Sequence, residues 1–212
     1  MKKNKKQKTK KKEEKFIIVN NIPDQNPRLD VRTLSLHGDV TEQRAADVIA
    51  GLLFLENTAL EELIQQESDP VTVAKNISLF ISTHGGAASE MYAIIDVMEM
   101  IKKRTCNIET FGIGKVMSAG VLILAAGTPG LRRVGKNCRI MLHSVMAGSS
   151  GTITSMENEI QEAKWTQERY VECLANYSNL TKSKIKKILK PERDVYISAE
   201  EAIKLGIADE II

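Results

Sequence analysis

Three side chains that could act together in nucleophilic catalysis occur along the chain in the order Ser118, His143 and Asp194. Ser118 lies between a strand-like run at 107–111 and an apolar, helix-like run at 121–126. A hydroxyl is a poor nucleophile until an imidazole takes its proton, and a carboxylate must hold that imidazole in the correct tautomer. The order and placement of the three residues are those of a serine hydrolase triad, and a chain with three histidines leaves few assignments for the base.

Attack of a serine on an acyl carbonyl also requires backbone N–H donors that already point at the developing oxyanion. The sequence offers two sources of such donors. Gly85 and Gly86 can turn their backbone toward a ligand because neither has a Cβ. The N–H of Ala119 follows the serine in the first turn of the expected helix, where the positive end of the helix dipole faces the oxygen.

Other roles for these side chains stay open on sequence grounds. Ser118 could be a helix N-cap, and His143 could be a buried histidine with a structural role. Lys115 could form a Ser-Lys dyad, although it precedes the serine by only three residues on the approach to the helix. His37 and His84 are expected to be structural or peripheral.

The third member of the triad has the most competitors. Asp194 follows Arg193 and could pair with it on the surface. Glu192 or Asp209 could take its place beside the histidine.

The pattern of apolar residues predicts the elements that must position these groups. Strand-like and helix-like runs alternate, which indicates an α/β fold with a parallel sheet built from right-handed βαβ crossovers. Reactive groups collect at the carboxyl ends of parallel strands, so Gly86, Ser118 and His143 are expected to converge on one crevice. Residues 57–75 are polar and acidic and are expected to form a surface insertion or loop with a helical piece. The expected strands are 32–37, 77–82, 107–111, 139–143 and 207–212, and the expected helices cover 45–53, 92–101, 121–126, 153–178 and 198–206.

Charge is concentrated at the amino terminus. Residues 1–15 hold nine of the 30 Lys and Arg residues and two of the 27 Asp and Glu residues. The segment has no aromatic or Arg residue for contacts to bases, so we expect a disordered Lys-rich tail at 1–15 rather than a nucleic-acid-binding arm. Residues 16–212 have the length of a single domain with its own core.

The cysteine pattern and the length of the apolar stretches indicate the cellular compartment of the protein. Cys106, Cys138 and Cys173 are widely spaced and follow no metal-binding or disulfide pattern, so they are expected to be reduced thiols. No apolar run in the sequence has the length of a membrane span or the form of a signal peptide. We therefore expect a cytoplasmic protein with no metal and no organic cofactor.

Seven segments of the chain follow a recognisable pattern in register. They are Leu36-His-Gly-Asp-Val40, Ile81-Ser-Thr-His-Gly-Gly86, Ala93-Ile-Ile-Asp96 with Met98, Met117-Ser-Ala-Gly120, Leu124-Ala-Ala-Gly127, Asn137-Cys-Arg-Ile-Met-Leu-His143, and Arg193-Asp194 with Ser198-Ala-x-Glu-Ala202. Through these segments the chain resembles the ClpP family, the proteolytic subunits of the Clp ATP-dependent proteases, from about Arg32 to Ile212.

The resemblance implies a fold, a site and an assembly. It implies a crotonase-like α/β spiral, with a protruding handle helix after residues 148–151. It gives Ser118 the role of nucleophile, His143 that of general base and then acid, and Asp194 that of orienting carboxylate. The N–H groups of Gly86 and Ala119 would form the oxyanion hole. It also implies two stacked heptameric rings enclosing a chamber, which an AAA+ unfoldase supplies with unfolded protein.

The sequence hypothesis is therefore a self-compartmentalised serine endopeptidase in ATP-dependent protein degradation. Two alternatives are kept. One is a phage-type maturation protease of the same fold that cuts capsid or scaffold proteins without an ATPase. The other is an inactive subunit that serves as a scaffold in a ring with active paralogues.

Overall fold

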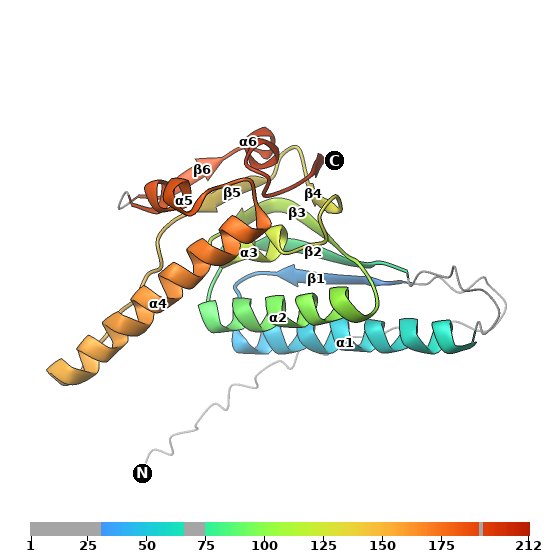
Figure 1. Ribbon diagram of the computed structural model, residues 1–212, viewed down its shortest axis with the longest axis horizontal. Coiled ribbons are helices and arrows are strands. Elements are labelled where there is room, and N and C mark those ends of the chain that lie inside the picture. Colours follow the sequence, from blue (N-terminus) through green and yellow to red (C-terminus); the bar gives the residue numbers. More distant parts are fainter. Residues whose placement is uncertain (1–30, 66–74, 191–192) are drawn as a thin grey trace, which may run out of the picture. The chain divides into compact units, whose positions relative to one another are not determined.

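A mostly parallel sheet carries the candidate site in the computed structural model (Figure 1), which describes residues 31–65, 75–190 and 193–212. Contacts divide the chain into Met1–Val31 and Arg32–Ile212, and the description below concerns the second unit. The strands run in the order β1-β2-β3-β4-β7, all parallel, while β5 pairs parallel with β3 and antiparallel with β6. Their bounds are β1 Thr33–His37, β2 Ile77–Thr83, β3 Ile108–Met117, β4 Arg132–Val134, β5 Arg139–Leu142, β6 Val195–Ile197 and β7 Glu210–Ile211.

Helices connect these strands and cover the sheet. α1 and α2 lie side by side along the β1 side of the sheet, and α3 packs beside the end of β3 (Figure 1). Fully buried apolar side chains such as Leu79 of β2, Met98 of α2 and Leu122 of α3 belong to one core. The helices are α1 Glu42–Gln65, α2 Ala88–Arg104, α3 Ala119–Ala125, α4 Ile153–Tyr177, α5 Lys182–Leu189 and α6 Ala199–Lys204.

The β3 strand changes neighbours along its length. Residues 110–112 pair with β4, and residues 115–117 pair with β5. Between these stretches the register against β2 shifts, and Gly114 adopts a positive φ of 64°. This bulge lets one long strand reach two partners and end at Ser118.

The α/β fold class predicted from the sequence is confirmed, with differences in detail. The third strand was expected to end at Phe111, but it runs on to Met117 because the bulge lets it pair again with β5. Residues 57–75 were expected to form a surface insertion or loop with a helical piece. Residues 57–65 are helical, but as the continuation of α1 to Gln65, since Leu55 and Ala59 extend its buried face by helical spacing. Residues 66–74 lie outside the described part. β4, β6 and α5 were not predicted.

Two carboxyl-terminal expectations hold. Ser198 and Glu201 form a capping box at the start of α6, with the Ser198 side chain accepting from the Glu201 N–H and the Glu201 carboxylate accepting from the Ser198 N–H. The last strand is β7, within the expected 207–212. The predicted boundary between a tail at 1–15 and a domain at 16–212 lies in residues that the structure does not describe.

Only the last third of the α4 helix contributes buried side chains. Its buried residues are Tyr170, Val171 and Leu174, all in its last third. Ile153, Ile160 and Trp165 are all more than half exposed, and the amino-terminal part extends beyond the sheet (Figure 1). Large exposed apolar side chains on one helix are typical of a surface that binds a partner molecule.

A largely buried arginine, Arg132, pairs with the partly buried Asp209 and joins four parts of the chain. The carboxylate of Asp209 accepts hydrogen bonds from the Arg132 guanidinium, at 2.5 and 2.8 Å, and from the backbone N–H groups of Gly130 and Arg132. The same guanidinium donates to the carbonyl oxygens of Ala125, at the end of α3, and Tyr177, at the end of α4. Arg132 therefore ties the carboxyl ends of both helices to β4 and to the chain just before β7.

This pair should make stability depend on pH. Burial raises the pKa of Asp209, but the hydrogen bonds from Arg132 and Gly130 outweigh it and hold the pKa below its ordinary value. A carboxylate with a lowered folded-state pKa stabilises the fold above its unfolded pKa of about 4, and that contribution is lost as the pH falls through the folded value.

We predict that Asp209→Asn lowers the free energy of unfolding by about 3 kcal/mol at pH 7, because Arg132 keeps its charge and loses its partner. The deficit should shrink as the pH is lowered toward about 3. Urea unfolding at fixed protein concentration measures both effects. The neighbouring Glu210→Gln, which removes a more exposed pair with Arg133, is the control and should cost less than about 0.5 kcal/mol. Equal unfolding midpoints for the two variants would contradict the prediction.

Candidate active site

Ser118 stands at a sharp junction between β3 and α3. Its backbone has φ 53° and ψ −121°, and among the described residues it is the one non-glycine residue with a positive φ. Its N–H donates to the carbonyl of Met141 in β5 at 2.8 Å, and its own carbonyl accepts from the N–H of Val121 at 3.0 Å. Strained backbone of this kind is retained where it presents a functional side chain, as in the nucleophile elbows of hydrolases.

Close packing of α3 against β2 helps to hold this turn. A Cβ on Gly120 would lie 2.4 Å from the methyl carbon of Thr83, so only a glycine allows the helix to start so close to the strand. The side chain of Thr83 is fully buried, and its hydroxyl accepts from the N–H of Gly85 at 2.9 Å. Thr83 thus shapes the glycine turn that follows β2, a role that the sequence analysis missed.

His143 meets the Ser118 hydroxyl. In the β3–β5 ladder Met117 lies opposite Met141, so the residues that follow both strands emerge at the same edge of the sheet. The distance from His143 Nε2 to Ser118 Oγ is 2.7 Å, a hydrogen bond in the geometry that proton transfer requires. The imidazole is largely buried, with 15% of the side chain exposed.

Asp194 approaches the other nitrogen of the same imidazole. The antiparallel pairing of β5 with β6 sets Leu142 opposite Val195, which brings the preceding Asp194 next to His143. Asp194 Oδ1 lies 3.7 Å from His143 Nδ1, longer than a direct hydrogen bond, and 47% of its side chain is exposed. The Tyr196 hydroxyl is 3.5 Å from Asp194 Oδ2.

The residues that could compete with the triad have different outcomes. Asp209 is held by Arg132, while Glu192 lies outside the described residues. Lys115 pairs in register with Arg139 on the β3–β5 ladder. His84 faces Asp39 at 3.9 Å with both side chains well exposed.

The glycine turn after β2 lies against the serine. A Cβ on Gly85 would be 2.6 Å from Ser118 Cβ and 3.1 Å from the Ala119 nitrogen, and its φ is 101°. Gly86 forms a parallel bridge with Val40, in which the Val40 N–H donates to the Gly85 carbonyl and the Ala87 N–H donates to the Val40 carbonyl. In a parallel bridge the bonds of one residue go to the two neighbours of its partner. The N–H of Gly86 itself is therefore turned away from Val40.

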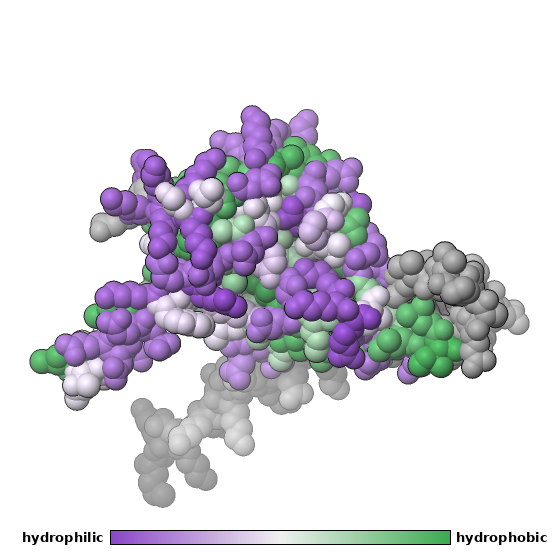
Figure 2. Space-filling view, in the orientation of Figure 1, coloured by the Kyte–Doolittle hydropathy of each residue, from purple (hydrophilic) through white to green (hydrophobic). Residues whose placement is uncertain are grey.

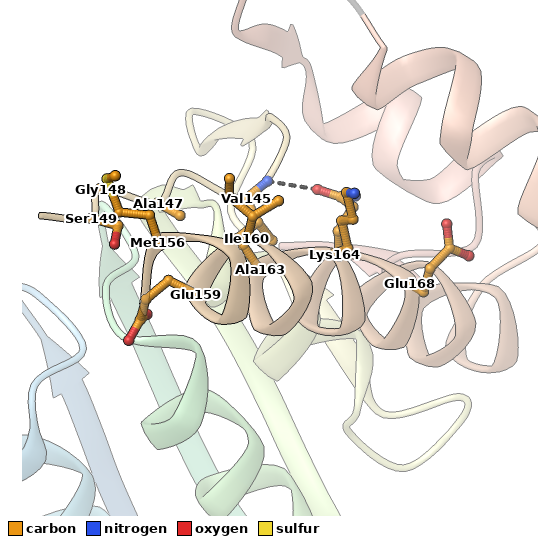
Figure 3. Close-up of a pocket in the computed structure, with 11 residues that line it drawn as sticks. Val145, Ala147, Gly148, Ser149, Met156, Glu159, Ile160, Ala163, Lys164 and Glu168 are labelled. Atoms are coloured by element: carbon orange, nitrogen blue, oxygen red, sulfur yellow. Dashed lines mark hydrogen bonds between the residues drawn. The ribbon is translucent and has the colours of Figure 1, made fainter. Parts of the chain in front are cut away.

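An apolar groove begins two residues after His143 (Figure 3). The extended segment from Val145 to Ser149 forms one wall and α4 forms the other, around a volume of about 710 Å³. The Val145 N–H donates to the side-chain carbonyl of Gln167 at 2.7 Å, which ties this segment to α4. Apolar side chains of the groove include Ala147, Met156, Ile160 and Ala163.

Residues 31–65, 75–190 and 193–212 contain no group of three or more His, Cys, Asp or Glu side chains placed to hold a metal ion. Within the same ranges, none of the helices combines the length and the apolar character that a membrane span needs. The three cysteines are free thiols, and burial raises the pKa of Cys138 to about 11.

A comparison with known protein families agrees with this geometry. The family described as Clp protease matches residues 20–212, nearly the whole chain. The chain belongs to the Clp protease family. Membership in this family supports a protease activity. The matched region begins at residue 20, before Arg32, where the resemblance described above begins.

In this member of the Clp protease family, the close approach of Gly85 to Ser118 leads to a testable prediction. We expect Gly85→Ala to slow reaction of Ser118 with a fluorophosphonate by about 100- to 1,000-fold, since the new Cβ would displace the serine and its neighbouring N–H. The matched control is Gly135→Ala, whose Cβ would meet other atoms only at 3.5 Å or more and which lies outside the groove. The labelling rate followed by intact mass measures the effect, and equal rates for the two variants would contradict it.

Proposed function

We propose that this member of the Clp protease family is a serine endopeptidase that cleaves peptide bonds through an acyl-enzyme on Ser118. The observation that carries the proposal is the 2.7 Å hydrogen bond between His143 Nε2 and Ser118 Oγ at a strained strand-to-helix turn. An N-cap serine requires no such turn, and a histidine with only a structural role requires no contact with this hydroxyl. The family match supports peptides as the substrate class.

The mechanism follows from the placement of these groups. His143 Nε2 takes the Ser118 proton as Oγ attacks the peptide carbonyl, and the resulting oxyanion is met by the N–H groups of Gly86 and Ala119. The imidazolium then gives its proton to the leaving amine, so that an acyl-enzyme remains. A water molecule, deprotonated by His143, attacks this ester and returns the enzyme to its starting state.

Asp194 acts in this scheme on the charge of the imidazolium. A carboxylate 3.7 Å from Nδ1 orients the ring in the tautomer that leaves Nε2 free to accept a proton, and it attracts the positive charge that forms on the ring during the reaction. Partial exposure weakens this attraction, so we expect Asp194 to contribute less than His143.

We further propose that the active form is a homo-oligomer, with two stacked heptameric rings as the arrangement that the resemblance implies. The exposed apolar side chains of α4 and the groove beside it supply the contact surface in this proposal, and a second copy of the chain is its occupant. Unfolded protein would reach the enclosed sites with the help of an AAA+ unfoldase, in the cytoplasm. No organic cofactor is needed for any step.

One sequence feature favours a second candidate, a phage-type maturation protease. Nine lysines in residues 1–15 take the place of the amino-terminal region that the resemblance leads one to expect. Degradation of a stably folded test protein only in the presence of ATP and a cognate unfoldase supports the first function. Cleavage of a capsid or scaffold protein without ATP supports the second.

We predict that a fluorophosphonate adds once per wild-type chain, at Ser118, and adds to neither Ser118→Ala nor His143→Ala. Asp194→Asn should still be labelled, about 10- to 1,000-fold more slowly than the wild type, because its carboxylate acts only through His143. Intact mass and peptide mapping provide the readout. An assembled wild-type protein that takes no label would contradict the peptidase and leave the scaffold subunit as the alternative.

A separate prediction concerns assembly. Ile160→Glu should shift the protein to smaller species in analytical ultracentrifugation, because a charge would enter the proposed contact between copies. Ser155→Glu adds the same charge to an exposed position of the same helix, on the side away from Ile160 and outside the groove residues, and is the matched control. A stable wild-type monomer at working concentration, or equal behaviour of the two variants, would count against the assembly.

A further inference from the structure

Tyr170 joins α4 to the backbone of the nucleophile. It is one of the three buried residues of that helix, and its hydroxyl lies 3.3 Å from the carbonyl oxygen of Ser118. The two residues are 52 positions apart in the sequence, so the contact is made by the packing of α4 beside the β3–α3 turn. Neither the triad nor the glycine turn uses this hydroxyl.

The carbonyl that Tyr170 contacts shares a peptide group with the N–H of Ala119. A peptide unit is planar and trans, so its C=O and its N–H point in opposite directions and move together. Whatever holds the Ser118 carbonyl therefore also aims the Ala119 N–H. Two donors hold it: the backbone N–H of Val121 at 3.0 Å and the Tyr170 hydroxyl.

The peptide needs such a restraint because the backbone next to it is strained. Rotation of this plane is governed partly by ψ of Ser118, which sits at −121° together with a φ of 53°. Residues in sparsely populated regions relax unless the surroundings fix them. A single helical hydrogen bond from Val121 leaves the second lone pair of the carbonyl oxygen free, and Tyr170 uses it.

The direction of the hydrogen bond follows from its surroundings. A carbonyl oxygen can only accept, so the phenol must donate its proton. Burial raises the pKa of Tyr170 well above its ordinary value, with the neighbouring Tyr92 adding to the shift. The phenol is thus protonated throughout the pH range in which a histidine base works.

We propose that Tyr170 is a positioning residue of the oxyanion hole: its hydroxyl holds the Ser118 carbonyl so that the Ala119 N–H faces the oxyanion of a peptide substrate. This inference rests on the proposed function, because it concerns the same serine. It assigns to α4 a role in the chemistry as well as in assembly. Gln167, one helical turn before Tyr170, holds the segment after His143 through Val145, so a single turn of α4 contacts both halves of the site.

The test compares Tyr170→Phe with Tyr92→Phe. Each variant removes one tyrosine hydroxyl that donates to a backbone carbonyl at the α4 packing surface, but the Tyr92 hydroxyl donates to Thr166 and not to Ser118. Peptide hydrolysis gives kcat, KM and the pH dependence of each variant. A peptide boronate serves as the probe of the oxyanion hole, because Ser118 Oγ adds to the trigonal boron as its proton passes to His143, leaving a tetrahedral anion.

We expect Tyr170→Phe to lower kcat by about 3- to 30-fold, between the effect of one neutral hydrogen bond and that of a lost oxyanion donor. KM and the midpoint of the pH profile should stay unchanged, and boronate affinity should fall by the same factor as kcat/KM. Tyr92→Phe should change each of these values by less than about twofold. Rates are normalised to the sites that finally accept a fluorophosphonate, so misfolded protein does not count.

Three outcomes would overturn the role of Tyr170 alone: equal kcat and boronate affinity in the two variants, a change confined to KM, or a shifted pH midpoint that points to His143 instead. A wild-type protein that accepts neither the fluorophosphonate nor the boronate at Ser118 would overturn the proposed function, and this inference with it. The wild-type labelling result separates the two kinds of failure.

Discussion

The parallel pairing of the end of β3 with β5 is the interaction on which the site depends. It sets Met117 opposite Met141, so that a serine and a histidine 25 residues apart in the sequence leave the sheet together. The bulge at Gly114 makes the pairing possible, since the first part of β3 is already engaged with β4. Without the second half of β3, the strained turn at Ser118 would lose the Met141 carbonyl that fixes its N–H.

Absence of side-chain atoms matters as much as their presence near this turn. Gly85 lets the turn after β2 approach the backbone of Met117 and Ala119, and Gly120 lets α3 approach the Thr83 methyl group, more closely than a Cβ would allow. Gly86, with φ 150° and the Val40 carbonyl where a Cβ would be, leaves its own N–H turned outward. Backbone donors held in this way are already oriented before a charge develops, which is the condition for electrostatic catalysis.

Sequence reasoning found the residues that lie on regular elements and missed those that depend on long-range packing. Ser118 and His143 could be predicted because each follows an apolar run long enough to show a period. β4 and β6 have three residues each, too few for a period, and so the pairing that brings Asp194 to His143 had no local signal. The sequence analysis assigned no role to Arg132, because its partner, Asp209, is 77 residues away. Tyr170 was not singled out either, since it is 52 residues from Ser118 and its neighbours in the sequence give no sign of the contact.

In the proposed mechanism, the turn of α4 that carries Gln167 and Tyr170 couples binding on the exposed part of the helix to catalysis at Ser118. Anything that binds the exposed side chains more tightly when this turn is docked shifts the helix toward the docked state. By reciprocity, a ligand that favours the aligned oxyanion donor strengthens that distant binding by the same factor. In this proposal no separate signalling element is needed, because the helix with the exposed apolar side chains also holds the Ser118–Ala119 peptide group.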